Sequence, residues 1–219
     1  RTTRDIVPRE AWEQINSLYI YARDHTPSRR GRYEFLRRVI QGAQQIGGLL
    51  AGEMSRTAAY DFVRLGHYLE RADMTTRILD VRSANLLSRA RQSQSQVQTQ
   101  TSAAAPEEQD PFDSIQWMSV LKSLSAYQMY RQQVRMRVNG PDVLKFLLQD
   151  EYFPRAVAFC LRQLDICLRK LPRHDAALAA LAALQQKLNA ATVPELTREG
   201  LHDFIDEVQV GLGELHDQI

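Results

Sequence analysis

Hydrophobic positions recur at helical spacing along most of the chain. The first apolar stripe holds Trp12, Ile15 and Leu18 and begins beside Pro8, whose fixed φ suits the first turn of a helix. Strand signals are nearly absent, because no alternating run of β-branched residues is bounded by turn pairs. The pattern therefore predicts an all-α protein, with seven or eight helices in one elongated bundle.

Four glycines interrupt the second apolar stripe, which runs over residues 35–50 and just beyond. They are Gly42, Gly47, Gly48 and Gly52, and each costs about 1 kcal/mol relative to alanine inside a helix. Close approach of a neighbouring helix would offset that cost, so we expect tight packing here and disruption by Gly48→Leu. A phosphate-binding loop is disfavoured, since neither a Gly-Lys-Ser/Thr ending nor a preceding strand is present.

The longest predicted helix follows Ser55, which suits an N-cap, and extends past Leu87. Gln, Ser, Thr and Ala then dominate a stretch with hardly an apolar anchor, which cannot offset its ordering entropy. The chain is therefore expected to consist of a first helical segment over 1–91, a flexible linker over 92–111 and the remaining helices of the bundle over 112–219.

Charged side chains lie beside the apolar stripe of this third helix. With about 100° per residue and Leu69 at the centre of the stripe, Asp73 and Asp80 fall within about 40° of that centre. Burying an unpaired carboxylate costs several kcal/mol, so both acids need partners. Arg77 follows Asp73 by one helical turn and is placed to form an ion pair with it.

Glu70 and Arg71 project from different sides of the same helix. On the wheel centred on Leu69, Glu70 lies about 80 to 100° to one side together with Arg77, while Arg71 lies on the far side. Two hypotheses follow. In one, an inter-helix groove binds a ligand or a partner; in the other, the charges form a structural ion-pair network that locks the helix between its neighbours. The residues concerned are Glu70, Asp73, Arg77 and Asp80.

Composition adds little to this picture. The chain has 219 residues, 44% hydrophobic and 25% charged, and 28 basic against 26 acidic residues leave a net charge of +2. That balance indicates neither a nucleic acid nor a membrane as partner, and no apolar run reaches the roughly 18 residues of a spanning helix. Two arginine clusters nevertheless keep a nucleic-acid-binding protein open as an alternative. They consist of Arg29, Arg30, Arg32, Arg37 and Arg38, and of Arg131, Arg135 and Arg137.

Metal sites, nucleophilic sites and cofactors are not predicted. A di-metal carboxylate bundle needs a Glu-x-x-His pair on each of two helices, and only Glu199 with His202 fits. The histidines share no metal-ligand spacing, and no Ser-His-acid arrangement is recognised. Cys160 and Cys167 would lie about 10 Å apart on a predicted helix, beyond disulfide reach, so both are expected as free core thiols. Without a cysteine framework or a signal peptide, the cytoplasm is the expected compartment.

A continuous block in the third helix carries a family resemblance. From Leu69 to Val81 it reads Leu-Glu-Arg-Ala-Asp-Met-Thr-Thr-Arg-Ile-Leu-Asp-Val. Further matching stretches stand before and after it, in the same order as in the family: Met54-Ser55-Arg56-Thr57, Phe62, Leu65-Gly66, Trp117, Leu121 to Tyr127, Tyr130, Phe146-Leu147-Leu148 and Phe153-Pro154-Arg155. Together these stretches resemble the Alpha-E family, a bacterial helical domain named for its Glu-Arg motif.

The resemblance implies a helical fold and a set of partners, but no activity for the domain itself. Family members typically carry two copies of the motif in tandem, so we expect this chain to hold the second copy and the end of the first. They look like components of a peptide synthesis or modification system, encoded or fused with ATP-grasp amide ligases, transglutaminase-like proteins and an amidohydrolase-type peptidase. By this resemblance, Glu70 and Arg71 become the leading candidates for ligand or partner binding, joined by Asp73, Arg77 and Asp80.

The expected function is that of a non-catalytic accessory or scaffold in a peptide-modifying system, with an ATP-grasp-type ligase or a transglutaminase-like protein as partner. One alternative is an enzyme of that system, in which Glu70 is the acid or base for a substrate bearing a carboxylate or phosphate. An enzyme requires Glu70 in a closed pocket with an arginine within hydrogen-bond reach. A scaffold requires Glu70 paired structurally and an apolar patch exposed elsewhere. The sequence leaves a homo-oligomer open.

Overall fold

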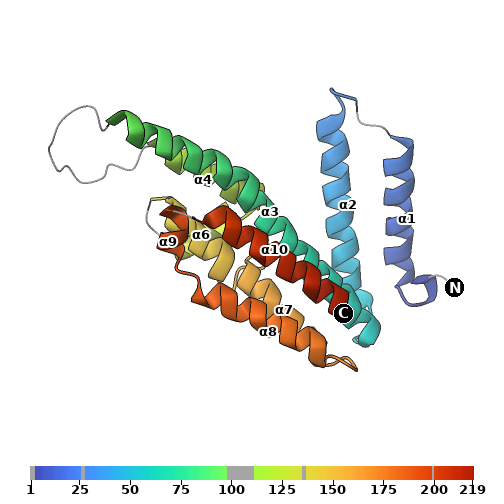
Figure 1. The fold of residues 1–219 in the computed structure, drawn as a ribbon. Coiled ribbons are helices and arrows are strands. Elements are labelled where there is room, and N and C mark those ends of the chain that lie inside the picture. Colours follow the sequence, from blue (N-terminus) through green and yellow to red (C-terminus); the bar gives the residue numbers. More distant parts are fainter. Residues whose placement is uncertain (1–2, 26–27, 98–110, 135–136, 199) are drawn as a thin grey trace. The chain divides into compact units, whose positions relative to one another are not determined.

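Helices make up the regular structure of the computed structural model, which describes residues 3–25, 28–97, 111–134, 137–198 and 200–219. Within these ranges there are ten α-helices, one short 3-10 helix and no strand, so the prediction of an all-α fold is confirmed (Figure 1). The elements are η1 (Thr3–Asp5), α1 (Arg9–Asp24), α2 (Arg32–Glu53), α3 (Ala58–Val97), α4 (Pro111–Ser123), α5 (Tyr127–Gln133), α6 (Gly140–Gln149), α7 (Val157–Leu168), α8 (Asp175–Ala190), α9 (Val193–Arg198) and α10 (Leu201–Gln218).

The chain forms two compact units, Arg1–Asp61 and Phe62–Ile219. The first is built on a hairpin in which α1 and α2 lie side by side (Figure 1). Its helices bury few side chains, since Ala11 is the one buried residue of α1 and α2 has none. The hairpin is therefore held by half-buried side chains along one seam.

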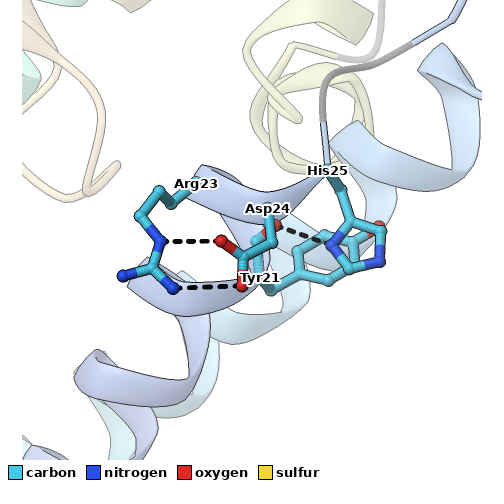
Figure 2. A network of polar contacts seen from close by, with 4 residues as sticks. All are labelled: Tyr21, Arg23, Asp24 and His25. Carbon is cyan, nitrogen blue, oxygen red and sulfur yellow. Dashed lines mark hydrogen bonds and ion pairs between the residues drawn. The ribbon is translucent and has the colours of Figure 1, made fainter.

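The end of α1 is closed by local polar contacts (Figure 2). His25 Nδ1 donates to the carbonyl of Tyr21 at 2.9 Å, and the two rings stack with centroids 4.4 Å apart. Arg23 binds the carboxylate of Asp24 through Nε at 2.7 Å and Nη2 at 3.1 Å. The Tyr21 carbonyl also accepts the backbone N–H of His25 at 3.1 Å, so His25 caps the last turn of α1 through both its backbone and its ring.

The glycines of α2 pack less tightly than their number suggests. At Gly42 an added Cβ would lie 3.0 Å from Leu18 Cδ1 on α1. At Gly47, Gly48 and Gly52 no atom lies within 4 Å of such a Cβ. The prediction of close helix approach is therefore correct at Gly42 and wrong at Gly48. The physical reason is that α1 covers the face of α2 that carries Gly42, and Gly48 points about 120° away from that face.

The second unit is organised around α6. This helix contacts α4, α7, α8 and α9, and α10 contacts α8 and α9. Asn139 caps the start of α6 by accepting a hydrogen bond from the Asp142 N–H at 2.9 Å. The helix is buried nearly all round, and α3 adds three residues of one face to the same core. The residues concerned are Gly140, Val143, Leu144, Phe146, Leu147 and Leu148 of α6 and Leu65, Ala72 and Leu79 of α3.

The apolar pattern predicts one helix from Asp113 and one from Pro194, and each of them corresponds to two helices in the structure. Ser125 has a φ of 52° between α4 and α5, and Gly200 has a φ of 83° between α9 and α10. A residue with left-handed backbone ends a helix, and the spacing of apolar residues does not reveal its position. The described ranges therefore hold more helices than the seven or eight expected. Helix α3 extends to Val97, so residues 92–97 of the predicted linker are helical, and Pro111 at its other end begins α4. Residues 98–110 lie outside the described residues.

Candidate functional site

The buried face of α3 is centred on Ala72 and not on Leu69. Leu65, Ala72 and Leu79 are at most 1% exposed, and the core of the second unit packs against this row. Leu69 is partly buried and lies about 60° to one side of it. The predicted centre is therefore wrong, because the apolar residues of one helix do not say which of them face the larger core. With Ala72 at the centre of the buried face, every charged side chain between Leu69 and Val81 lies at a different angle to the core than predicted.

Arg71 faces the segment that leads into α7. Its Nη1 donates to the carbonyl of Pro154 at 3.1 Å, and one turn later Thr75 Oγ1 donates to the carbonyl of Arg155 at 2.9 Å. Thr75 is 1% exposed, and Arg71 is half-buried. Two side chains of α3 thus bind two consecutive carbonyl groups. The prediction that Arg71 lies on the far side of the helix is wrong, since it followed from the misplaced stripe.

His67 and Tyr68 complete the surroundings of Arg71. Arg71 Nη2 donates to Nε2 of His67, which requires a neutral ring with its proton on Nδ1. Burial lowers the pKa of Arg71, and burial together with the charges of Arg71 and Arg155 lowers the pKa of His67. The guanidinium carbon also lies 5.7 Å from the centre of the Tyr68 ring. The arrangement holds one cation beside a neutral histidine.

The segment that receives Arg71 is itself ordered by polar contacts. Asp150 Oδ1 accepts hydrogen bonds from the N–H groups of Tyr152 at 2.9 Å and Phe153 at 2.6 Å. Cys160 Sγ lies 3.6 Å from the carbonyl of Pro154, and burial raises the pKa of this thiol to about 12. Cys160 and Cys167 are buried thiols that form no disulfide, as predicted.

Glu70 points to solvent, about 160° from Ala72. Within the described part of the chain its carboxylate makes no hydrogen bond and no ion pair. The structure therefore meets neither the requirement of an enzyme, Glu70 in a closed pocket, nor that of a scaffold in which Glu70 is paired structurally. Glu70 and Arg71 are neighbours in sequence whose side chains point about 100° apart, Arg71 toward the segment before α7 and Glu70 toward solvent.

Asp73 and Arg77 form the ion pair that their spacing predicts. Arg77 Nε lies 2.6 Å from Asp73 Oδ2, with the side chains 56% and 22% exposed respectively. Exposed pairs of this spacing contribute about 0.3–0.5 kcal/mol, because water and salt screen them. This pair orders the surface beside Glu70 without fixing the fold.

Asp80 lies beside the first turns of α10. Its Oδ1 is 2.6 Å from His202 Nδ1, and His202 Nε2 is 3.5 Å from Asp206 Oδ2. The hydrogen bond to Asp80 and the charge of Asp206 raise the pKa of His202. One ligand atom from each of the three residues lies within 4.8 Å of the others, so this cluster is the group among the described residues that could hold a metal ion. Sequence spacing misses it, because Asp80 and His202 are 122 positions apart.

The arginine clusters are partly engaged within the first unit. Arg37 Nη2 lies 3.0 Å from Glu34 Oε1, and the Arg38 guanidinium lies 4.2 Å from the centre of the Tyr21 ring. Arg135 lies outside the described residues. Two of the arginines on which the nucleic-acid alternative depends, Arg37 and Arg38, therefore contact other side chains of the same chain.

A family described as a predicted α-helical domain with a conserved ER motif matches residues 1–219. The chain belongs to the Alpha-E family. The ER motif of this Alpha-E protein is Glu70-Arg71, because the sequence contains no other Glu-Arg dipeptide. Its two residues have different surroundings: Arg71 is bound to the segment before α7, and Glu70 is exposed.

Two other comparisons returned no relative. No curated protein and no solved structure matches this Alpha-E chain. Among the described residues, no helix is both long and apolar enough to cross a bilayer.

Two hollows of the Alpha-E protein lie away from its ER motif. One of about 360 Å³ is bordered by α8 and α10, where the Lys187–Glu207 ion pair of 2.9 Å links the two helices. Another of about 380 Å³ is bordered by α6 and the turn after it. Glu70 lines neither of them.

Proposed function

We propose that this Alpha-E protein is a non-catalytic accessory or scaffold of a bacterial peptide synthesis or modification system. It binds its partners through the solvent-facing side of α3. An ATP-grasp-type amide ligase or a transglutaminase-like protein is the expected partner by family resemblance, and the cytoplasm is the expected compartment.

The observation that carries this proposal is a row of exposed residues on α3, which we call the outer row. Val63 is 36% exposed, Met74 42% and Val81 64%, and Glu70 lies among them. A helix can bind a partner protein through apolar side chains that recur at three- or four-residue spacing on one face, with nearby charges that pair across the contact. The outer row consists of Val63, Gly66, Glu70, Met74, Arg77 and Val81.

Among the described residues Glu70 is not paired as the scaffold hypothesis required, but its exposure leaves it accessible to a partner and favours binding over acid–base chemistry. A catalytic carboxyl is usually tuned by burial and by neighbouring groups, whereas Glu70 is exposed. Arg71, the arginine next to it in sequence, is bound to the carbonyl of Pro154. A hydrated carboxylate beside apolar side chains is suited to pairing with a cation of a partner protein.

Co-purification from the native host tests the proposal. We expect the tagged chain to bring down a ligase or transglutaminase-like protein, identified by mass spectrometry, and Glu70→Gln to reduce its yield at least fivefold. Glu214→Gln is the matched control, because Glu214 is an exposed acid on α10. Equal recovery with Glu70→Gln, or turnover of a candidate peptide substrate by the purified chain alone, would contradict the proposal.

A further inference from the structure

We infer that the outer row of α3 binds the outer row of a second copy of this chain, with the two α3 helices antiparallel about a twofold axis near Met74. The inference rests on the proposed function, since it names one partner of the same face. It follows from the order of charges and of large and small residues along the row.

The outer row is continuous enough to form a helix–helix seam. Its members are spaced by three or four residues from Val63 to Val81, which is the spacing of one face of an α-helix. At about 1.5 Å per residue the row is about 27 Å long. Glu70 and Arg77 are seven residues apart and point within about 20° of each other, so a helix that packs on one also reaches the other.

An antiparallel pair with its axis near Met74 places unlike residues opposite each other. Residues whose numbers add to 147 then lie at the same height, so Glu70 of each copy faces Arg77 of the other. Gly66 likewise faces Val81. No atom lies within 4 Å of an added Cβ at Gly66, so the branched side chain of Val81 has room there.

The charges select this orientation. A parallel pair in register would place Glu70 against Glu70 and Arg77 against Arg77, which is unfavourable. In the antiparallel pair both contacts are attractive and occur twice, as twofold symmetry requires. Arg77 already binds Asp73 through Nε, and a guanidinium has further N–H donors for a second carboxylate.

The size of the seam sets the strength of the contact. One row about 27 Å long buries less than the roughly 800 Å² per partner of a standard stable interface. We therefore expect a weak dimer whose population depends on protein concentration and, because of the two ion pairs, falls as salt rises.

Charge reversal in the full 219-residue chain tests the inference by sedimentation equilibrium. Glu70→Arg and Arg77→Glu are each expected to weaken self-association at least tenfold, because each places like charges across the axis. The double variant E70R/R77E restores opposite charges and is expected to recover dimerisation to within threefold. Glu214→Gln is the control, since Glu214 is an exposed acid on α10 outside the outer row and its replacement is expected to leave self-association unchanged. Circular dichroism checks that each variant is folded.

Crosslinking at the axis gives an independent measurement. Met74→Cys is expected to form a covalent dimer on mild oxidation, whereas Val210→Cys, also exposed but on α10, is expected not to. A wild-type chain that stays monomeric at high concentration, or a double reversal that does not recover association, overturns the inference. Partner capture that still depends on Glu70 would then show that only self-association has failed and that the proposed function stands.

Discussion

At the residue scale, the two residues of the ER motif have different surroundings and different roles. Arg71 and Thr75 anchor α3 to the segment before α7 through the carbonyl groups of Pro154 and Arg155, while Glu70 remains in solvent. The sequence predicts a helix here, and helix geometry places neighbouring positions about 100° apart. It does not show which of the two faces the core, because apolar residues flank both.

Arg71→Ala is expected to lower the free energy of unfolding by about 1–2 kcal/mol. The variant leaves the Pro154 carbonyl without its charged donor, and the half-exposed position keeps the loss below that of a fully buried site. Urea denaturation followed by circular dichroism measures the change. Glu70→Gln is the matched control and is expected to stay within about 0.5 kcal/mol of wild type, as exposed substitutions do. A larger loss at Glu70 than at Arg71 would reverse these assignments.

Cys160 is expected to resist alkylation in the native protein. Burial raises its pKa to about 12, so almost none of it is thiolate at neutral or mildly alkaline pH. Iodoacetamide labelling, read by mass spectrometry, is expected to modify Cys160 at least a hundredfold faster in urea than in buffer. Rapid labelling of the folded chain near neutral pH would show that the segment before α7 opens readily.

At the element scale, apolar periodicity predicts where helices lie but not where each one bends or stops. The expected start beside Pro8 agrees with α1, which begins at Arg9. The breaks at Ser125 and Gly200 depend instead on single residues with positive φ. The effect of a glycine is equally hard to predict from apolar periodicity, because it depends on which neighbouring atoms lie close to it.

Two glycines of α10 are expected to respond oppositely to alanine. An added Cβ at Gly211 would lie 2.5 Å from Leu184 Cδ2 and 3.1 Å from its Cγ, whereas no atom lies within 4 Å at Gly213. We therefore expect Gly211→Ala to destabilise the chain by about 1–3 kcal/mol, the usual cost of overpacking. Gly213→Ala is expected to stabilise it by about 0.5–1 kcal/mol through helix propensity. Thermal and urea denaturation measure both, and equal effects at the two sites would contradict the packing of α8 on α10.

At the scale of the whole molecule, contacts between segments far apart in sequence determine which charged side chains pair and how their pKa values shift. Asp80 and His202 meet because α3 and α10 belong to the same unit, and the resulting hydrogen bond joins segments that are 122 positions apart. The predicted network around Asp80 thus has a partner on another helix. The partner is a histidine, so the contact depends on pH.

The contribution of His202 to stability is expected to fall as pH rises. Its pKa is raised above the ordinary value of 6.5, so the protonated form is favoured in the folded state. That contribution is fully present below about pH 6.5 and is lost as pH rises through the folded-state pKa. We expect the difference in melting temperature between wild type and His202→Asn to shrink from pH 6 to pH 9.

The pKa of His67 is shifted in the opposite direction from that of His202, so His67 provides a control. Its pKa is lowered, so its neutral form is favoured and the associated stability is lost as pH falls below about 6.5. The difference between wild type and His67→Asn is therefore expected to shrink toward acid pH. If both variants followed wild type in parallel at all pH values, neither histidine would have the surroundings described above.

The sequence by itself determined that this protein is helical, that Cys160 and Cys167 are separate buried thiols, and that Asp73 and Arg77 pair, because each of these follows from spacing within one helix. Only the tertiary structure decided that Arg71 faces the fold, that Glu70 faces solvent and that Asp80 meets His202. The physical reason is that the buried face of a helix is set by the larger core packed against it, which is assembled from segments far apart in the chain.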